Sequence, residues 1–448
     1  IKIRRENMKK DKKRISDYFG MVAVKLGGQI HLRSLRDGFA SIMPFMILAG
    51  FVIFINYVIL EPSGFMWKII DPKILTRLQE IGSSVSNGTL GIITVIVTAS
   101  VSYHLSQNRN FDNVLASVLV SLSTLFVVTP FMSTFKPEGL NESFVVNGVI
   151  PVNYTNATGM FVGIIVGLFA TDIFIKLSAN KKLQINIAGD IPPAVIKSFN
   201  VLIPIMINVI IFAIISFLLN LLFKLDFNQL ISMLITKPLS HVTTSLFGFL
   251  FLMCLGNLFF GFGIHQAVIS NPLLDPFLLQ NMQENMLAYA NHQPIPHIIT
   301  SAFKDVFGIT GGSGNTIALL IAIFIFGRRK DYKDVAKMSF MPGLFNINEP
   351  VIFGLPIVFN PFLIVPFVIA PVFSLLTAYF ATSVGLINHV VVQIPWTTPP
   401  VISAFLATGG DWRAAVLQLV IIIITIFIYL PFLKMDERMS KINKDDIS

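Results

Sequence analysis

The sequence predicts an all-α polytopic membrane protein with about ten transmembrane helices and two re-entrant hairpins. The chain of 448 residues is 54% hydrophobic and only 13% charged, far less charge than a soluble protein of this length carries. It contains a series of long uncharged runs, and roughly 20 apolar residues suffice for one helical crossing of the hydrocarbon layer. Two further segments are nearly uncharged but rich in proline and glycine, which a regular lipid-facing helix does not tolerate.

The uncharged runs give the predicted crossings in order. Spans are expected near 38–60, 84–106, 113–133, 155–177, 198–222, 240–262, 264–290, 308–327, 359–383 and 414–433. The seventh is the poorest span because it contains Asp275 and Glu284. A span of that polarity is expected to face protein or a water-filled cavity instead of lipid.

Basic residues give the predicted orientation. Eleven Lys and Arg lie in residues 1–37, so this N-terminal segment is predicted to be cytoplasmic, with part of it along the membrane surface. The stretch GRRKDYKDVAK at 327–337 carries five more basic residues and is cytoplasmic if three spans lie between 224 and 327. The tail at 434–448 then lies on the same side. We therefore interpret the net charge of +9 as a topology signal and expect no nucleic-acid partner.

Two irregular segments interrupt the second half of the chain. MPGLFNINEPVIFGLP lies in a hairpin expected at 340–356 from the cytoplasmic side, and QIPWTTPPVISAFLATGGDW in one expected at 393–412 from the outside. Irregular backbone at membrane depth is tolerated only where protein covers it or where it lines a cavity. Two broken segments that enter from opposite sides are typical of the substrate site of a transporter.

Glu349 is the carboxylate of the first irregular segment. An isolated carboxylate is costly to bury, so this one is expected to be neutral, paired or hydrogen-bonded. One interpretation is a structural carboxylate that caps backbone amides of the hairpin. The other is a ligand contact in a polar cavity beside Asn346 and Asn348, because Asn, Glu and a stacking aromatic suit a neutral polyhydroxy ligand.

Two more residues are candidates for the same site. His265 follows three glycines in GNLFFGFGIHQAV. It is either a satisfied packing residue or, paired with Glu349, a group that holds a hydroxyl or relays a proton. Trp396, in the second irregular segment, is either an interface anchor or a platform for the face of a pyranose ring.

The sequence also argues against several functions. GITGGSGNT at 308–316 lacks the Gly-Lys-Ser/Thr ending of a nucleotide-binding loop. The single cysteine, Cys254, lies in an apolar run, so we expect inert packing, no internal disulfide and no cysteine-based metal cluster. We expect neither a metal nor a cofactor. An ion gradient or a separate protein must then power this transporter.

Three stretches, GGSGNT, FNINEPVIFGLPIVFNP and WTTPPVISAFLATGGDWRAAVLQ, closely resemble the enzyme IIC component of bacterial phosphotransferase systems. The resemblance is to the lactose/cellobiose/N,N′-diacetylchitobiose family and covers about residues 25–433. It implies a homodimeric sugar permease of the bacterial inner membrane with both termini cytoplasmic. It further implies a scaffold and dimerisation domain at 38–225 and a substrate-binding domain at 226–433.

The resemblance also implies a chemistry. A β-linked disaccharide, cellobiose or N,N′-diacetylchitobiose, would move inward, and its 6-hydroxyl would take a phosphoryl group from a phosphocysteine of the IIB component, which IIA recharges. By match to the motifs, Glu349 is the glutamate near that hydroxyl, His265 is its partner and Trp396 is the tryptophan of the second hairpin. Cys254 lies in a span, so this chain is expected to carry no phosphoacceptor cysteine and to use IIB and IIA in trans. The alternative is a proton-coupled disaccharide symporter that uses Glu349 and His265.

Overall fold

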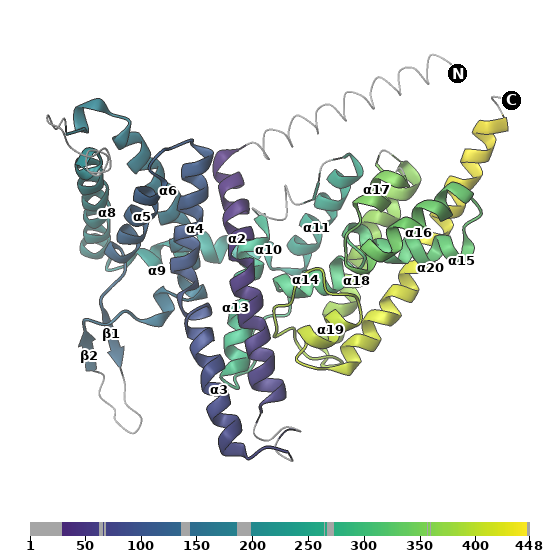
Figure 1. Cartoon of the computed structure of the whole chain (residues 1–448), viewed down its shortest axis with the longest axis horizontal. Helices are drawn as coiled ribbons and strands as arrows, with labels where there is room; N and C mark the ends of the chain where they lie inside the picture. The colour runs from purple at the N-terminus through teal and green to yellow at the C-terminus, as the bar shows by residue number, and fades with distance from the viewer. Residues whose placement is uncertain are drawn as a thin grey trace. The chain divides into compact units, whose positions relative to one another are not determined.

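The computed structural model describes residues 29–61, 66, 69–135, 144–185, 199–263, 265–266, 273–355, 357–358 and 360–445. Their contacts divide the chain into two compact units, whose elements are labelled in Figure 1. The smaller unit consists of Gly28–Met46 and Ser84–His241, and the larger unit contains Ile47–Ser83 and Val242–Ser448. Helices α2 (Ile30–Phe54) and α3 (Pro72–Asn87) therefore contribute residues to both units.

The described chain is mostly helical in both units. The smaller unit also contains η3 (Leu90–Ile92), α4 (Ile93–Asn108), α5 (Val114–Val127), β1 (Met132–Phe135), β2 (Phe144–Asn147), η4 (Val152–Tyr154), η5 (Ala157–Gly159), α6 (Met160–Ser178), η6 (Lys181–Leu183), α8 (Leu202–Phe223), α9 (Phe227–Ile231), η7 (Ser232–Thr236) and most of α10 (Lys237–Thr243). The larger unit also contains η1 (Ile55–Ile59), α11 (Leu246–Gly261), α13 (Asp275–Ala290), α14 (Ser301–Gly308), η8 (Ser313–Asn315), α15 (Thr316–Phe326), α16 (Lys330–Leu344), α17 (Glu349–Gly354), α18 (Pro361–Ser383), α19 (Ile402–Ala407) and α20 (Trp412–Asp445). Strands β1 and β2 pair antiparallel, with Met132 opposite Asn147.

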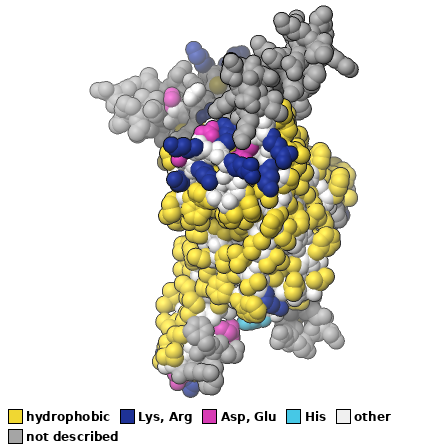
Figure 2. Space-filling view, turned by 90° about the vertical axis from the view of Figure 1, so that its right-hand side faces the viewer, with side chains coloured by type: hydrophobic (Ala, Val, Ile, Leu, Met, Phe, Trp, Pro, Cys, Tyr) yellow, Lys and Arg dark blue, Asp and Glu magenta, His cyan; other side chains and the backbone are white. Residues whose placement is uncertain are grey.

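The helices confirm a polytopic helical membrane protein. Seven helical stretches among the described residues are long and apolar enough to cross a membrane: Ile30–Ile59, Pro72–Asn108, Ala157–Ser178, Leu202–Phe223, Ser301–Phe326, Pro361–Ser383 and Trp412–Met439. Two shorter apolar helices, α5 and α11, coincide with two more predicted spans. Figure 2 shows a broad belt of hydrophobic side chains on one face of the molecule. The count of about ten crossings stays a prediction.

Helices α2 and α20 are among those that extend beyond the predicted spans. Helix α2 begins at Ile30, so residues 30–37 extend a spanning helix, although their charges led us to place them in the interfacial segment. The charged side chains of this extension find partners, since His31 Nε2 lies 2.5 Å from Asp172 Oδ2 and Arg36 Nη2 lies 2.8 Å from Asp37 Oδ1. Residues 1–28, the rest of that predicted segment, lie outside the described residues. At the other end, α20 continues to Asp445 instead of ending at 433.

Small and hydroxylated side chains hold the helices of the smaller unit together. A Cβ atom at Gly163 of α6 would lie 2.7 Å from the Thr98 hydroxyl of α4, so only glycine permits this approach. The hydroxyls of Ser102, Ser121 and Thr171 join α4, α5 and α6 through hydrogen bonds of 2.6–3.0 Å. Such contacts are usual between membrane helices, where no hydrophobic driving force draws one helix to another.

Amide side chains of α13 fix two irregular segments of the larger unit. Asn281 Nδ2 donates to Ile299 O at 2.9 Å, so the chain after α13 runs back along this helix toward α14. Asn285 Nδ2 donates to His297 O at 2.7 Å and to Val390 O at 2.9 Å. Backbone that forms no helix thus finds hydrogen-bond partners inside the protein, as burial at membrane depth demands.

The chain after α18 also folds back on itself. Val391 N and Val392 N both donate to Ala407 O, at 2.8 and 3.0 Å, which places the irregular segment against the end of α19. On another side of the same segment, a Cβ atom at Gly50 would lie 2.0 Å from Gln393 O, so α2 approaches this backbone closely. The broken segment is therefore covered by protein on these sides.

Candidate functional site

The turn between α14 and α15 depends on left-handed backbone. Gly311, Gly312 and Gly314 have φ angles of 77°, 96° and 76°. Side chains would not fit at these positions: a Cβ atom at Gly312 would lie 2.3 Å from Asn348 Cγ, and one at Gly314 would lie 2.2 Å from Phe367 Cδ2. The Gly-rich stretch that interrupts this membrane helix therefore lets other segments contact its backbone directly.

Asn346 joins three broken segments. Its side chain is buried, and its φ of 62° lies in the left-handed region that asparagine tolerates. Its Oδ1 accepts a hydrogen bond from Gly311 N at 2.7 Å, and its Nδ2 donates to Trp396 O at 2.6 Å and Thr398 O at 3.2 Å. The Gly-rich turn, the NINEP segment and the WTTPP segment thus meet at one side chain.

Asn348 makes a second connection to the Gly-rich turn. Its Nδ2 donates to Ser313 O at 2.7 Å and to Thr316 Oγ1 at 3.2 Å, and its side chain is buried. Both predicted asparagines therefore use their side-chain amides in hydrogen bonds inside the protein. A contact of either one with a ligand stays a prediction.

The structure brings Glu349 and His265 into electrostatic range of each other, and a shared role at the site stays a prediction. Glu349 is the first residue of α17, both residues are exposed, and the carboxylate is close enough to His265 to interact with it electrostatically. The His265 ring lies on the Phe260 ring, with centroids 4.7 Å apart. Exposure leaves these two polar groups accessible to a ligand.

Trp396 combines a fixed backbone with an accessible ring. Its carbonyl is held by Asn346, and Thr398 N donates to Pro395 O at 3.0 Å across the same turn. The Trp396 side chain is 46% exposed. An indole that is accessible on an ordered turn suits stacking on a ligand ring.

The segment after Trp396 has an unusual backbone. Val401 has a φ of 73°, which is rare for a β-branched residue. Gln418 of α20 holds it, because Gln418 Oε1 accepts a hydrogen bond from Val401 N while Gln418 Nε2 donates to Val306 O at 2.6 Å. Sequence reasoning gave no role to Gln418, which connects the second irregular segment to α14 through α20.

Sequence reasoning also missed a buried ion cluster. Lys304 Nζ of α14 lies 2.7 Å from Asp275 Oδ1 and 3.6 Å from Asp305 Oδ1, and all three side chains are less than 20% exposed. Lys304 and Asp305 stand before the uncharged run at 306–327, so their charges suggested a loop. A helical pattern was visible in the spacing of the buried residues Ala302, Phe303, Val306 and Phe307. Among the described residues, no group of three or more His, Cys, Asp and Glu side chains could hold a metal ion.

Replacing Asn346 by Gly is expected to lower the free energy of unfolding by about 1–3 kcal/mol, because the buried Gly311 N–H loses its acceptor. Glycine keeps the left-handed backbone, so the loss reports on the side chain alone. The measurement is the midpoint of thermal denaturation in detergent. Asn110→Gly is the matched control, since Asn110 is an exposed asparagine with a φ of 52°. Equal midpoints for the two variants would contradict a joining role for Asn346.

Known proteins share this architecture. A family model described as "Phosphotransferase system, EIIC" matches residues 36–371. The oligo-beta-mannoside-specific EIIC component of Bacillus subtilis is 34% identical, over 96% of this chain and 94% of that protein. The cellobiose-specific EIIC component of Geobacillus stearothermophilus is 33% identical, over 92% of this chain and 91% of that protein.

A solved structure is also similar over almost the full length. It is the crystal structure of the transporter ChbC, the IIC component from an N,N′-diacetylchitobiose-specific phosphotransferase system. It is 33% identical in sequence, covers 96% of this chain and 99% of that chain, and superposes with a TM-score of 0.89. With its helical membrane architecture and these relatives, the chain belongs to the EIIC family of phosphotransferase-system sugar permeases, in the cellobiose/lactose group.

Proposed function

We propose that this chain imports a β-linked disaccharide, cellobiose or N,N′-diacetylchitobiose, and presents its 6-hydroxyl to the phosphorylated IIB protein. The substrate class is supported by the cellobiose-specific relative and by the diacetylchitobiose-specific structural neighbour. One geometric observation carries the proposal. Glu349 and His265 lie exposed and in electrostatic range of each other, and Glu349 directly follows the buried Asn346 and Asn348 in the chain.

The proposed reaction needs little covalent chemistry from this chain. The sugar O6 attacks the phosphorus of the phosphocysteine, an O–P bond forms, and the S–P bond breaks with its electron pair on the departing thiolate. Glu349 accepts the proton of the 6-hydroxyl and later releases it, while His265 donates a hydrogen bond to the sugar. Phosphoryl transfer depends mainly on the placement of nucleophile and phosphorus, which groups fixed on an ordered junction supply.

We also propose the assembly and orientation that go with this function. The domain predicted at 38–225 would form the contacts of a homodimer, and the domain at 226–433, which contains all five predicted site residues, would bind one sugar. Both termini would lie in the cytoplasm of a bacterial cell, with IIB and IIA acting in trans. Membership of the EIIC family does not favour the alternative of a proton-coupled symporter.

Transport into proteoliposomes tests the proposed function. With phosphorylated IIB enclosed, external disaccharide should appear inside as the 6-phosphate, and a protonophore should have no effect. Without IIB, no sugar phosphate should form. Accumulation of unmodified disaccharide that collapses with a protonophore would overturn the proposal and indicate a symporter.

Replacing Trp396 by Ala is expected to weaken disaccharide binding by about 1–3 kcal/mol, the range between a lost aromatic contact and a lost binding hot spot. Trp396→Phe should retain most of the affinity because an aromatic face remains. Calorimetric titration with cellobiose and with N,N′-diacetylchitobiose measures both variants. Trp412→Ala is the control, since Trp412 is 68% exposed at the start of α20. If Trp396→Ala binds like Trp412→Ala, Trp396 is only an anchor.

A further inference from the structure

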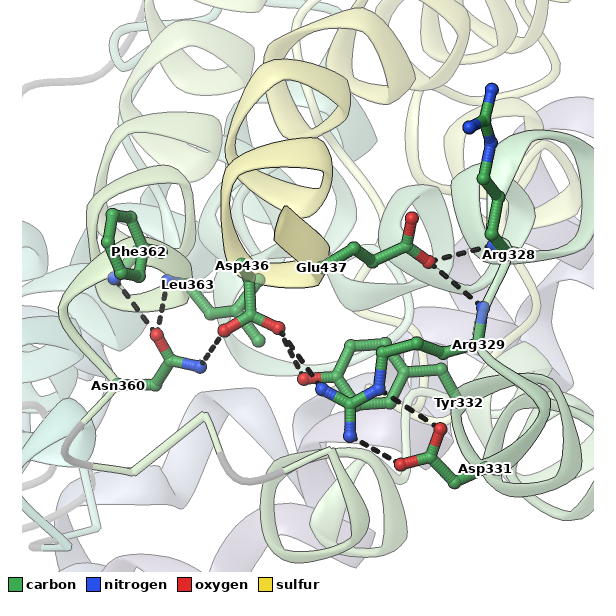
Figure 3. A network of polar contacts seen from close by, with 9 residues as sticks. All are labelled: Arg328, Arg329, Asp331, Tyr332, Asn360, Phe362, Leu363, Asp436 and Glu437. Atoms are coloured by element: carbon green, nitrogen blue, oxygen red, sulfur yellow. Dashed lines mark hydrogen bonds and ion pairs between the residues drawn. The ribbon is translucent and has the colours of Figure 1, made fainter. Parts of the chain in front are cut away.

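Glu437, near the end of α20, binds the backbone where α16 begins. Its side chain is buried, and its Oε1 accepts hydrogen bonds from Arg328 N at 2.8 Å and Arg329 N at 3.2 Å (Figure 3). The carboxylate therefore contacts the two arginines through their amides instead of their guanidinium groups. A carboxylate at the start of a helix is also favoured by the helix dipole.

Asp436, next to Glu437 on α20, forms hydrogen bonds with α16 and with the residue before α18. It accepts hydrogen bonds from the Tyr332 hydroxyl of α16 and from Asn360 Nδ2, the latter at 2.7 Å. Asn360 in turn caps α18, since its Oδ1 accepts from Phe362 N at 3.0 Å. Burial and the hydrogen bond to Asp436 raise the pKa of Tyr332, so this hydroxyl remains a donor. Helices α16, α18 and α20 are thus locked together at this end.

The charge of Arg329 is balanced by neighbouring side chains of α16. Its guanidinium pairs with Asp331, with Nε 3.0 Å from Oδ1, and lies 3.9 Å from the centroid of the Tyr332 ring. The hydrogen bond from Arg329 holds the pKa of Asp331 below its usual value, so the carboxylate is ionised at neutral pH. Arg329 therefore has partners in this chain for both its charge and its flat face.

The side chain of Arg328 differs from that of Arg329 in its surroundings. Its backbone is fixed by Glu437, but its side chain is exposed and points away from the polar network in Figure 3. Within the described part of the chain, its guanidinium makes no hydrogen bond or ion pair. The structure thus holds the backbone of an arginine whose charge has no partner among the described residues.

Other cations are exposed around Arg328. This basic surface consists of Arg328, Lys330, Lys337, Lys434 and Arg438. Asp331, which pairs with Arg329, and Asp334 are exposed carboxylates of α16, while Asp436 and Glu437 are buried. Figure 2, which views the side where α16 and α20 lie in Figure 1, shows Lys and Arg side chains gathered beyond the hydrophobic belt. Met338, Met341 and Met435 add adaptable apolar contacts, since each is at least 50% exposed.

The basic surface belongs to the same structural piece as Glu349. Helix α17, which Glu349 begins, packs against α16 so closely that a Cβ atom at Gly354 would lie 2.7 Å from Val335 Cγ1. The positive-inside rule accounts for cations at this end of the helices, but it does not require any of them to be fixed. Arg328 meets this condition at its backbone, which Glu437 holds, so the segment that carries its side chain need not be ordered when it contacts an anion.

We propose that the basic surface docks the phosphorylated IIB protein, with Arg328 contacting an anionic group of that partner. The inference rests on the proposed function, in which this partner brings a phosphoryl dianion to the sugar. Arginine suits the contact because its fork of donors binds a phosphoryl or carboxylate group with two hydrogen bonds. The anionic group could come from an acidic side chain of IIB or from its phosphoryl group, and the test distinguishes these two sources.

The test measures phosphorylation of disaccharide by phosphorylated IIB, with this chain in nanodiscs of neutral lipid. Arg328→Ala is expected to raise the KM for phosphorylated IIB about tenfold and to leave the Kd for disaccharide unchanged. The KM of Arg328→Lys should lie between those of the parent and Arg328→Ala, because lysine keeps the charge but lacks the forked donors of arginine. If Arg328→Ala weakens the binding of phosphorylated IIB but not that of unphosphorylated IIB, the contact is with the phosphoryl group. Equal weakening of both IIB forms assigns it to acidic side chains.

Lys182→Ala is the matched control, since Lys182 is an exposed cation of η6 in the smaller unit. An equal rise in KM for Lys182→Ala would indicate an effect of net charge and overturn the inference. A rise for Arg328→Ala only in nanodiscs with anionic lipid would assign the surface to lipid headgroups instead. If the parent transfers phosphate and Arg328→Ala matches it, only this inference fails. If the parent transfers none, the proposed function fails and this inference fails with it.

Discussion

Replacing Glu349 by Gln is expected to reduce disaccharide phosphorylation by at least about a hundredfold, the lower range for loss of a general base. The amide keeps the shape of the side chain and one acceptor oxygen, but it cannot take the proton of the 6-hydroxyl. Disaccharide binding should fall much less, because the ring contact of Trp396 and the fold of the junction remain. The two measurements are initial rates with saturating phosphorylated IIB and the Kd for the sugar.

A cycle of two proteins and two sugars tests the contact itself. A 6-deoxy disaccharide should bind the parent more weakly than the normal sugar does, and about as well as the normal sugar binds Glu349→Gln. Both combinations have lost the same interaction, so the two losses should not add. Fully additive losses would mean that Glu349 does not touch the 6-hydroxyl.

Glu284→Gln is the control for this prediction. Glu284 also faces a histidine, with its Oε2 2.6 Å from His297 Nε2, and it lies in the same unit. It is not part of the NINEP junction, so its neutralisation should leave phosphorylation unchanged. A comparable loss in Glu284→Gln would show that the assay responds to any Glu–His pair in the larger unit and would remove the support for Glu349.

Replacing Lys304 by Met is expected to destabilise the protein by about 3–5 kcal/mol, as found when one partner of a buried ion pair is removed. Methionine keeps most of the volume, but Asp275 and Asp305 lose the cation between them. Adding Asp275→Asn should restore part of the stability, because one of the two buried charges is then removed. Denaturation midpoints in detergent measure all three proteins.

An exposed ion pair provides the comparison for Lys304. Asp331→Asn removes the charge that pairs with Arg329, and the Asp331 side chain is 61% exposed. A pair of this kind contributes about 0–1 kcal/mol, so its midpoint should stay near that of the parent. If Lys304→Met is no less stable than Asp331→Asn, the two aspartates are not held as buried charges and the cluster has no structural role.

The sequence by itself determined the class of protein and predicted the neighbourhood of its candidate site. In lipid, every backbone polar group needs an internal partner, so long apolar runs have few structures open to them. That constraint placed most helices to within a few residues, for example α8 and α18. The same constraint made the NINEP and WTTPP segments stand out, because proline and glycine in an uncharged stretch require protein around them. The family motifs also predict Glu349 and His265 as partners, and the structure brings them into electrostatic range.

Only the tertiary structure decided what individual polar side chains do. Asn346 and Asn348 were grouped with Glu349 because they are its neighbours in sequence, yet both amides bind backbone atoms of other segments. The partners of Asn346 lie 35 and 50 residues away, and Lys304 lies 29 residues from Asp275. No local pattern encodes such pairs, because a hydrogen bond depends on distance and angle in space and not on separation along the chain. For the same reason, the sequence marked Arg328 and Arg329 as equal charges, and among the described residues the fold pairs the guanidinium of Arg329 but not that of Arg328.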